Sequence, residues 1–439
     1  MAKVMTQTAP GADSDLGAAA DPRGTAYAVP ATEVQRLQCH GRAAVVIGAG
    51  PAGLMAALTI RHEGYDSVIV LEKRSHFTRM NVVNLHPESL GVFMRLGLLD
   101  RFLETASRLV DHKNYVFVDG EELFNFSDHG FEAAVDPDAR FDADDVLGGF
   151  TNETLYSINL ADLQLLLATA ALERGIQILA PVAGTVEPQG DGHHAVVLSQ
   201  DEAGHPLAVL HPRLVVLAEG AKGTIVREIA GEGDTAATLW PNENWVIGNV
   251  RCHPREGLSQ LLFEFDRRCE RLTISNCIYL PKRGEVNLSV TVDDPRIDPA
   301  SIGELVAKQA AKTLAITKVP CDRLEPIWHS RQAVRIVGRS AQHCCIGRNV
   351  VLVGDSMGSN SPVAALGCTL STSAHSYALR HLVHDLEGCS EAALARYEER
   401  ARACVARWHD KVAEIRAVVE TDLPANGRRL LGQQGRRQP

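Results

Sequence analysis

Short apolar runs separated by turn residues recur along this chain, and their spacing predicts its first structural unit. Residues 45–47 form a β-branched run, glycines follow it, and an apolar-periodic segment then extends through Ile60. A second β-branched run covers Ser67 to Leu71 and ends in Glu72. This order predicts a strand, a helix and a parallel strand, which together form a βαβ unit at the start of a doubly wound sheet.

A different pattern follows in the middle of the chain. Four short β-rich runs, "NENWVIGNVRC", "LSQLLFEFD", "RLTISNCIYLP" and "EVNLSVTVDD", are divided by turn signals and precede the helical segment "SIGELVAKQAAKTLAI". We expect an antiparallel sheet whose outer face is covered by that helix and whose inner face lines a pocket. Tyr115 to Glu132 reads as a hairpin that extends the pocket wall.

The chain therefore has the pattern of an α/β protein, in which a Rossmann-like nucleotide-binding domain carries an inserted antiparallel β-sheet domain. Near the end, Glu391 to Glu420 has the spacing of an amphipathic helix that packs on the body of the protein or forms a dimer contact. The expected parts are a disordered extension over 1–41, a discontinuous nucleotide domain over 42–114, 155–235 and 336–388, a substrate domain over 115–154 and 236–335, a helix over 389–422 and a flexible tail over 423–439.

Composition narrows the classes of partner. The 439 residues are 45% hydrophobic, and no apolar run approaches the roughly 20 residues of a membrane-spanning helix. A net charge of −10 argues against binding to nucleic acid or to anionic membranes. The ten cysteines show neither CxxC spacing nor a disulfide framework, and no signal peptide is evident. We expect a cytoplasmic protein, a monomer or a homodimer, that takes a small molecule and has no metal site.

The glycines after the first strand have the spacing of a dinucleotide-binding loop. Gly48 permits the tight turn, Gly50 lets the backbone approach a pyrophosphate, and Gly53 allows close packing of the helix on the strand. Pro51 and Ala52 complete the loop, and the helix amino terminus favours an anion. Glu72 can accept hydrogen bonds from both ribose hydroxyls and disfavours a 2′-phosphate. The alternative reading is a glycine turn in an ordinary doubly wound sheet.

The residues that follow this unit carry a resemblance to a known family. "EKRSHFTRMNVVNLHP" and "INLADLQLLLATAALERGIQI" resemble the class A FAD-dependent monooxygenases, and in particular the hydroxylase domain of the MICAL proteins. The resemblance covers roughly Ala43 to Leu382. It implies the aromatic-hydroxylase-like fold and FAD as the cofactor, with Lys73 and Arg74 among the cofactor-binding residues and Arg79 reaching the flavin or its phosphates.

The resemblance also assigns a second motif, which is tied to the use of a reduced nicotinamide cofactor. In "LVVLAEGAKGTIVRE", Glu219 replaces the usual Asp, Gly223 replaces a usual Ser, and Arg227 is kept. The alternative is a strand, turn and helix of structural use only. Where the family often has Arg or Gln beside the flavin this chain has Leu160, with Asn159 and Gln164 as possible substitutes.

The third motif lies in "LVGDSMGSNSPVAALGCTLSTSAHSYALRHL". The resemblance places Asp355 at the FAD ribityl chain, Pro362 near the flavin ring, and Gly367, Cys368 and Thr369 at the start of a helix facing the ring. Several positions depart from the family: Gly358 replaces a common His, Ala364 and Ala365 replace Gly-Gly, and Thr369 replaces the usual Asn. The cradle for FAD is kept, while its surroundings are changed.

Three functions fit these observations. The first is an FAD-dependent monooxygenase that uses NADH or NADPH to hydroxylate or epoxidise an apolar molecule, in bacterial secondary metabolism. The second is a non-redox, FAD-containing cyclase of the dialkyldecalin-forming type, which catalyses a [4+2] cycloaddition on a polyketide. The third is a flavin-binding protein without catalysis. The sequence identifies no catalytic acid or base, and its pocket candidates, each of which also fits plain core packing, are Trp245, Phe263, Phe265, Tyr279, Trp328 and His329.

Overall fold

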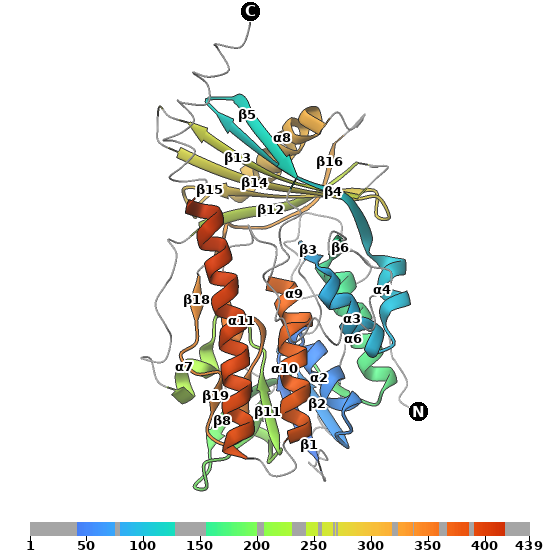
Figure 1. Cartoon of the computed structure of the whole chain (residues 1–439), viewed down its shortest axis with the longest axis vertical. Coiled ribbons are helices and arrows are strands. Elements are labelled where there is room, and N and C mark those ends of the chain that lie inside the picture. Colours follow the sequence, from blue (N-terminus) through green and yellow to red (C-terminus); the bar gives the residue numbers. More distant parts are fainter. Residues whose placement is uncertain are drawn as a thin grey trace, which may run out of the picture.

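The structure is a computed structural model in which two layers lie one above the other (Figure 1). The upper layer is a broad β-sheet, and the lower layer is a parallel sheet surrounded by helices. The structure describes residues 42–74, 80–127, 155–199, 206–230, 243–252, 257–266, 268, 271–317, 324–336, 338–359, 367–385 and 390–417.

The lower layer is built on a six-stranded sheet. Its order is β19 (Cys345–Ile346), β20 (Val350–Leu352), β11 (Leu214–Leu217), β1 (Ala43–Ile47), β2 (Ser67–Leu71) and β7 (Gln177–Leu179). All neighbours pair in parallel except β19 with β20. The predicted βαβ unit is present as β1, α2 (Pro51–His62) and β2. These strands are mostly apolar because both faces of a parallel sheet are covered.

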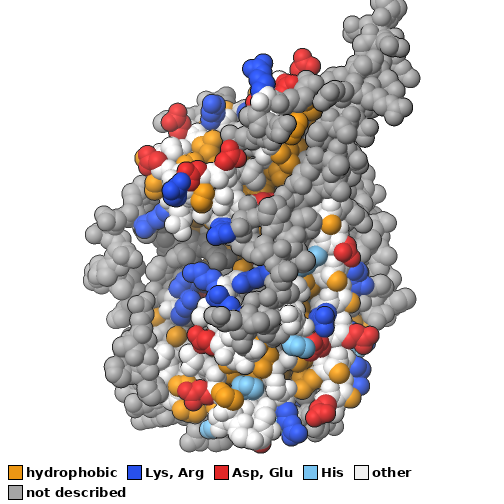
Figure 2. Space-filling model, turned by 90° about the vertical axis from the view of Figure 1, so that its left-hand side faces the viewer, with side chains coloured by type: hydrophobic (Ala, Val, Ile, Leu, Met, Phe, Trp, Pro, Cys, Tyr) orange, Lys and Arg blue, Asp and Glu red, His pale blue; other side chains and the backbone are white. Residues whose placement is uncertain are grey.

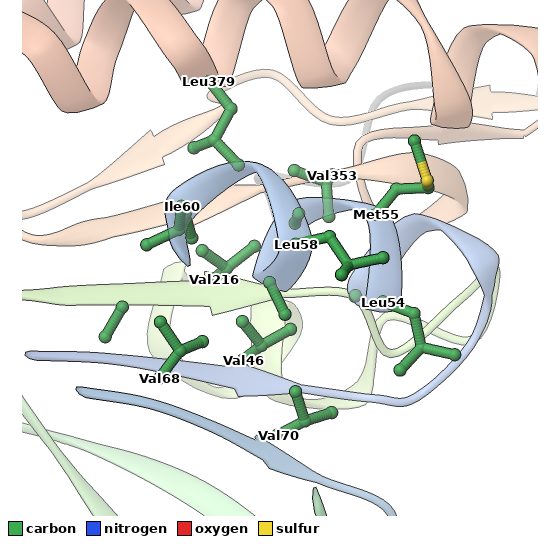
Figure 3. Packing of buried hydrophobic residues seen from close by; sticks show 14 of the residues in the cluster. Val46, Leu54, Met55, Leu58, Ile60, Val68, Val70, Val216, Val353 and Leu379 are labelled. Atoms are coloured by element: carbon green, nitrogen blue, oxygen red, sulfur yellow. The ribbon is translucent and has the colours of Figure 1, made fainter. Parts of the chain in front are cut away.

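Helix α2 lies between this sheet and the helices outside it. Leu54 and Leu58 approach Val46 of the sheet, while Leu379 of α10 (Ala374–Asp385) covers α2 from the other side (Figure 3). The four side chains are fully or almost fully buried. Other elements complete the layer: α3 (Pro87–Arg95), α4 (Leu99–Thr105), α6 (Leu160–Glu173), α7 (Thr224–Ala230), α9 (Gly367–Thr372) and α11 (Glu391–Ala417), with the small sheet β8 (Ala183–Pro188), β9 (His194–Ser199) and β10 (Pro206–Leu210).

The upper layer is a ten-stranded sheet. Its main order is β16 (Glu325–His329), β12 (Glu243–Arg251), β15 (Glu285–Val292), β14 (Arg271–Leu280), β13 (Gly257–Asp266), β4 (Ser107–Val118), β6 (Leu155–Asn159) and β3 (Val82–Leu85). Strand β17 (Val334–Ile336) pairs with β12, and β5 (Glu121–Ser127) pairs with β4. Helix α8 (Pro299–Thr317) covers the upper face, so the other face is turned toward the lower layer (Figure 1).

The two faces of this sheet contain different residues because strand side chains alternate. The outer face packs Val246, Leu288 and Val290 against Ile302 and Val306 of α8. The inner face is formed by the residues that alternate with these along each strand. Two of its asparagines, Asn249 and Asn287, are buried and hydrogen-bonded to each other. The inner face is therefore the more polar of the two.

Some strands pair in a different sheet from the one that their predicted domain would suggest. Strands β3 and β6 and the first half of β4 lie in the predicted nucleotide domain but pair within the ten-stranded sheet. The predicted hairpin is present as β4 and β5, which turn at Asp119 (φ 51) and Gly120 (φ 86), and its part beyond residue 127 lies outside the described residues. In the described part of the chain, none of the helices is long and apolar enough to cross a membrane.

Candidate functional site

The three sequence motifs meet at one edge of the lower sheet. A Cβ on Gly48 would lie 2.3 Å from the carbonyl oxygen of Ala218, the residue before Glu219. A Cβ on Gly354 would lie 2.6 Å from the Cβ of Ala52. Gly48 and Gly354 adopt φ values of 109 and 62, which favour glycine, so both turns need this residue type. The glycine loop thus contacts the second motif on one side and the third motif on the other.

Two glycines of the first motif differ in their surroundings. A Cβ on Gly53 would lie 1.9 Å from the carbonyl oxygen of Gly48, so Gly53 is required by packing within the protein. A Cβ on Gly50 would meet nothing within 4 Å. Gly50 is the N-cap of α2 and makes no side-chain cap hydrogen bond, and Pro51 opens the helix. Open space before uncapped helix N–H groups fits the pyrophosphate of a dinucleotide.

Glu72 is held at the end of β2 in its charged form. Its Oε2 accepts from Ala49 N at 3.1 Å, and its Oε1 accepts from Arg74 N at 3.0 Å and Arg74 Nε at 2.9 Å. Burial raises the pKa of Glu72, but hydrogen bonds and charge from Arg74, with the Ala49 bond, lower it overall. A carboxylate oxygen can accept further hydrogen bonds, so Glu72 still fits the ribose hydroxyls. Lys73, which lies between Glu72 and Arg74 in the sequence, is exposed.

The two polar residues predicted to replace the family's Arg or Gln, Asn159 and Gln164, both form hydrogen bonds with backbone groups. Gln164 is buried and donates from Nε2 to Ala49 O at 3.1 Å. Asn159 caps α6 by accepting from Ala161 N at 2.9 Å, and it donates to Met80 O at 2.8 Å. Gln164 therefore supports the glycine loop from below. Arg79, the neighbour of Met80, lies outside the described residues.

The acid of the second motif caps a helix. Both carboxylate oxygens of Glu219 accept hydrogen bonds, from Ile225 N and Val226 N, each at 3.0 Å. These are N–H groups of the first turn of α7, which otherwise lack partners. The longer Glu side chain, compared with the Asp of the family, reaches this turn.

A basic cluster of Lys222, Arg227 and Arg339 lies beside that motif. Arg227 donates to Lys222 O at 2.9 Å, and a Cβ on Gly223 would lie 3.6 Å from Arg339 Nη2. Burial, followed by the positive charge of Arg227, lowers the pKa of Arg339, while Asp355 and Glu219 act in the opposite direction. Figure 2 shows Lys and Arg side chains gathered at mid-height on the side of the molecule that includes α7.

Asp355 lies in the 3-10 turn η3 (Gly354–Ser356), which follows β20, and a buried histidine holds this turn. His375 Nδ1 accepts from Gly354 N at 2.9 Å, which leaves the imidazole proton on Nε2. Burial lowers the pKa of His375 to about 4, so the ring is neutral near pH 7. Ser356 Oγ accepts from Gly220 N at 3.1 Å and ties the turn to the second motif.

Helix α11 packs against two glycines of the third motif, the altered position Gly358 and the retained Gly367. A Cβ on Gly358 would lie 2.5 Å from Val405 Cγ1, so the space of a side chain here is filled by α11. A Cβ on Gly367 would lie 3.2 Å from the Trp408 ring. Thr369 Oγ1 accepts from His86 N at 3.1 Å and joins α9 to the start of α3.

The remaining residues of this motif are placed as follows. Burial, with a smaller effect of Asp355, raises the pKa of Cys368 to about 12, so this thiol stays neutral. Pro362, Ala364 and Ala365 lie outside the described residues.

The register of the upper sheet places a row of residues in the middle of its inner face. Ile247 pairs with Ser289, Ser289 pairs with Asn276, and Asn276 pairs with Leu261. Ile247, Ser289 and Asn276 are all partly exposed, although their strands lie inside the sheet. Partial exposure at the centre of a covered face indicates open space between the two layers. This row was not predicted from the sequence.

The predicted pocket residues divide between the two faces. Trp245 and Phe263 lie on the inner face, buried in a cluster with Leu261 and Ile274, and Trp328 pairs with Asn249 on the same face. Phe265 lies toward the end of β13, opposite Leu272.

Tyr279 and His329 lie elsewhere. Tyr279 is fully buried in the α8 core, and a Cβ on Gly303 of α8 would lie 3.3 Å from His329 Cδ2. The structure therefore does not bring these two residues to the space between the layers.

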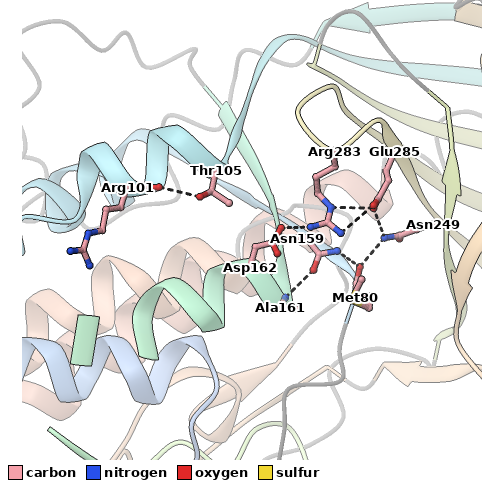
Figure 4. Close-up of polar contacts among 9 residues, drawn as sticks. All are labelled: Met80, Arg101, Thr105, Asn159, Ala161, Asp162, Asn249, Arg283 and Glu285. Carbon is pink, nitrogen blue, oxygen red and sulfur yellow. Dashed lines mark hydrogen bonds and ion pairs between the residues drawn. The ribbon is translucent and has the colours of Figure 1, made fainter. Parts of the chain in front are cut away.

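A polar network joins the two layers at one side of this space (Figure 4). Arg283 pairs with Asp162 of α6 and donates from Nε and Nη2 to the two oxygens of Glu285, each at 3.1 Å. Asn249 Nδ2 donates to Glu285 Oε2 and to Met80 O, each at 3.3 Å. The network fixes the sheet against α6 and holds Met80 between them.

Comparison with known proteins identifies the family. The FAD binding domain family FAD_binding_3 matches residues 42–412. The chain belongs to this family. It comprises the class A flavin monooxygenases, so the predicted family is confirmed, and FAD is its cofactor. Within it, 200 residues are 27% identical to the zebrafish (Danio rerio) [F-actin]-monooxygenase mical1, which covers 44% of this chain and 12% of that protein.

Two other proteins extend the comparison. A 3-(3-hydroxy-phenyl)propionate/3-hydroxycinnamic acid hydroxylase of Mycobacterium avium is 28% identical over 221 residues, or 46% of this chain and 33% of that protein. Among solved structures, p-nitrophenol 4-monooxygenase PnpA from Pseudomonas putida superposes with a TM-score of 0.62 at 20% identity, covering 89% of this chain and 97% of that chain. At this identity the likeness shows the fold, and the predicted fold class is confirmed.

Proposed function

We propose that this protein is an FAD-dependent monooxygenase that hydroxylates or epoxidises a small, largely apolar molecule with NADH or NADPH as reductant. The observation that carries the proposal is the partly exposed row Ile247, Ser289 and Asn276, which faces the FAD-binding layer beside the buried Trp245 and Phe263. The Ala-rich and Arg-rich composition supports a role in bacterial secondary metabolism. The substrate is the expected partner, and the protein acts as a monomer or homodimer.

The residues at the motif edge fit FAD. The loop at Gly50 leaves space before the uncapped helix, Glu72 is charged at the ribose position, and Asp355 is held in its turn. When bound, the flavin supplies the transfer of electrons from a reduced nicotinamide to oxygen. The protein supplies geometry and a site closed to water. Gln164 orients the glycine loop, and His375 and Ser356 orient the turn that carries Asp355.

The inner face of the upper sheet would hold the substrate. Trp245, Phe263 and Ile274 present an apolar surface that keeps water out, and the Arg283 network closes one side. The basic cluster beside the second motif supports binding of a nicotinamide nucleotide, because its positive charges attract phosphate.

A non-redox cyclase remains the second candidate, and two observations favour it. Both oxygens of Glu219 are used in capping α7, and the common His position is occupied by Gly358 packed against Val405. Residues that the family associates with redox turnover are thus used for structure. A cycloaddition needs only a shaped apolar space that holds the two reacting groups together.

One experiment separates the two functions. FAD-loaded protein is mixed with NADH or NADPH under ¹⁸O₂, with p-nitrophenol, 3-(3-hydroxyphenyl)propionate and linear polyketide polyenes as first substrates. A monooxygenase consumes one reduced nicotinamide for each ¹⁸O atom found in product. An isomeric product formed without reductant or ¹⁸O would establish the cyclase and reject the monooxygenase.

A further inference from the structure

We propose that Asn276 is the specificity-determining residue of the inner face, and that its side-chain amide accepts a hydrogen bond from a neutral hydroxyl or amine group of an otherwise apolar substrate. The inference deepens the proposed function and rests on it for the identity of the site. It is carried by the position of Asn276, by the state of its amide oxygen and by the residues around it.

Asn276 lies at the centre of the inner face. Its strand, β14, is flanked by β15 and β13, and its direct cross-strand partners are Ser289 and Leu261. On its own strand the next residues of the same face are Ile274 and Ile278. The outer-face residues beside it in sequence, Ser275 and Cys277, are fully buried under α8, whereas Asn276 is partly exposed. Its side chain therefore extends toward the space between the layers.

The amide oxygen of Asn276 is buried and has no hydrogen-bond partner among the residues that the structure describes. The nearby asparagines are different: Asn249 Oδ1 accepts from Asn287 Nδ2 at 2.6 Å, while Asn249 Nδ2 donates to Met80 O and Glu285. Leaving a buried acceptor unpaired costs roughly 1–3 kcal/mol. Such a group on the face between the two layers is explained if a bound molecule supplies the missing donor.

The surroundings define the chemistry of that donor. Ile274, Ile278 and Leu261 are 5%, 2% and 5% exposed, so the oxygen lies in an apolar setting where a hydrogen bond is strong and its loss is costly. The described inner-face neighbours of Asn276 on β13, β14 and β15 include no ionisable side chain. An uncharged acceptor whose described inner-face neighbours carry no positive charge favours a neutral hydroxyl or amine over a carboxylate or a phosphate.

A matched pair of ligands tests the inference. 2-Methoxynaphthalene has a methyl group in place of the donor hydrogen of 2-naphthol. The binding of both to FAD-loaded protein is measured from the change in flavin absorbance without any reductant. We expect the wild type to bind 2-naphthol at least about tenfold more tightly, because a site built to accept a hydrogen bond rejects the analogue that lacks it. Asn276→Leu should remove this preference while keeping the affinity for 2-methoxynaphthalene.

Asn244→Leu is the control, because Asn244 lies on the same sheet in β12 but on the alternate face, with its amide donating to Asp293 O at 3.4 Å. This variant should keep the preference. The ligand-free Asn276→Leu protein should also melt at a temperature equal to or above that of the wild type, since it loses an unpaired buried oxygen. If Asn276→Leu lowers the melting temperature too far for binding studies, Asn276→Ala replaces it.

The results separate this inference from the proposed function. A wild type without preference for 2-naphthol, or an equal preference in the wild type and Asn276→Leu, would overturn the role of Asn276. A preference that depends on Asn276, in a protein that never transfers ¹⁸O to product, would keep the role and reject the monooxygenase.

Discussion

The glycine loop and the inner face of the upper sheet differ in how fully their polar groups are paired within the protein. At the loop, backbone approaches backbone so closely that a Cβ on Gly53 would lie 1.9 Å from a carbonyl oxygen, and each polar side chain nearby holds main chain. On the inner face, the amide oxygen of the partly exposed Asn276 has apolar neighbours and no hydrogen-bond partner among the described residues. A cofactor that is always the same permits tight packing. A substrate must enter and leave, so its site contains polar groups whose hydrogen bonds form only when the substrate binds.

The largest effect should come from Gly53. Gly53→Ala places a methyl group against Gly48 O, and Ala218 Cβ, 3.0 Å away, prevents the methyl group from shifting to the other side. We therefore expect a loss of at least about 3 kcal/mol in unfolding free energy. Urea denaturation followed by circular dichroism measures this. A variant of unchanged stability would show that the loop is not tightly packed.

His375 should make the cofactor edge sensitive to acid. The pKa of its imidazole falls from 6.5 to about 4 on folding, because burial disfavours the charged ring. The neutral ring's contribution is thus complete above about pH 6.5 and is lost as pH falls toward 4, at a cost of about 3 kcal/mol. His375→Asn keeps an acceptor for Gly354 N and should weaken this pH dependence, measured by denaturation at pH 7 and pH 4.5. The exposed His62→Asn is the control and should behave as the wild type.

The junction between the layers should come next. The Arg283, Asp162 and Glu285 side chains are 11%, 18% and 10% exposed, so Arg283→Met leaves two largely buried carboxylates without their cation. We expect a loss of about 2–4 kcal/mol in unfolding free energy. Arg296→Met, which breaks a pair whose Arg is 87% exposed, should leave the melting temperature unchanged. Equal effects of the two substitutions would contradict the assigned junction.

The smallest effect separates the two kinds of glycine. Gly50→Ala meets no protein atom within 4 Å, so stability without cofactor should stay as in the wild type. The methyl group enters the space assigned to the pyrophosphate, and we expect a loss of about tenfold in FAD affinity, measured by flavin fluorescence. Gly190→Ala also meets nothing within 4 Å and should change neither quantity. Unchanged FAD affinity in Gly50→Ala would place the pyrophosphate elsewhere.

The sequence predicted the βαβ unit at the cofactor edge because its signals are local. The β-branched runs, the three glycines and Glu72 lie within one stretch of chain, and β2 has the predicted bounds Ser67–Leu71. The family resemblance supplied the second and third motifs, which parallel strands bring to the same edge whatever the loops between them.

The inner face could not be predicted in the same way. Alternation along a strand gives two sets of residues but does not say which set faces α8, because that depends on the pairing of distant strands. Trp245 and Tyr279 had equal support in the sequence, and the register puts them on opposite faces. Asn276 had no signal at all, since an unpaired amide is visible only once its neighbours are known. The hydrogen bond from Gly354 N to His375 spans 21 residues of sequence, and no sequence pattern indicates it.

The packing of Val405 on Gly358 has a consequence for redesigning this part of the protein. With Val405 Cγ1 only 2.5 Å from a Cβ at position 358, a histidine at that position would fit only after Val405 had been replaced by a smaller residue or α11 had moved. Either substitution made alone would leave the contact poorly packed. Positions 358 and 405 are therefore coupled, and a change at one requires a compensating change at the other.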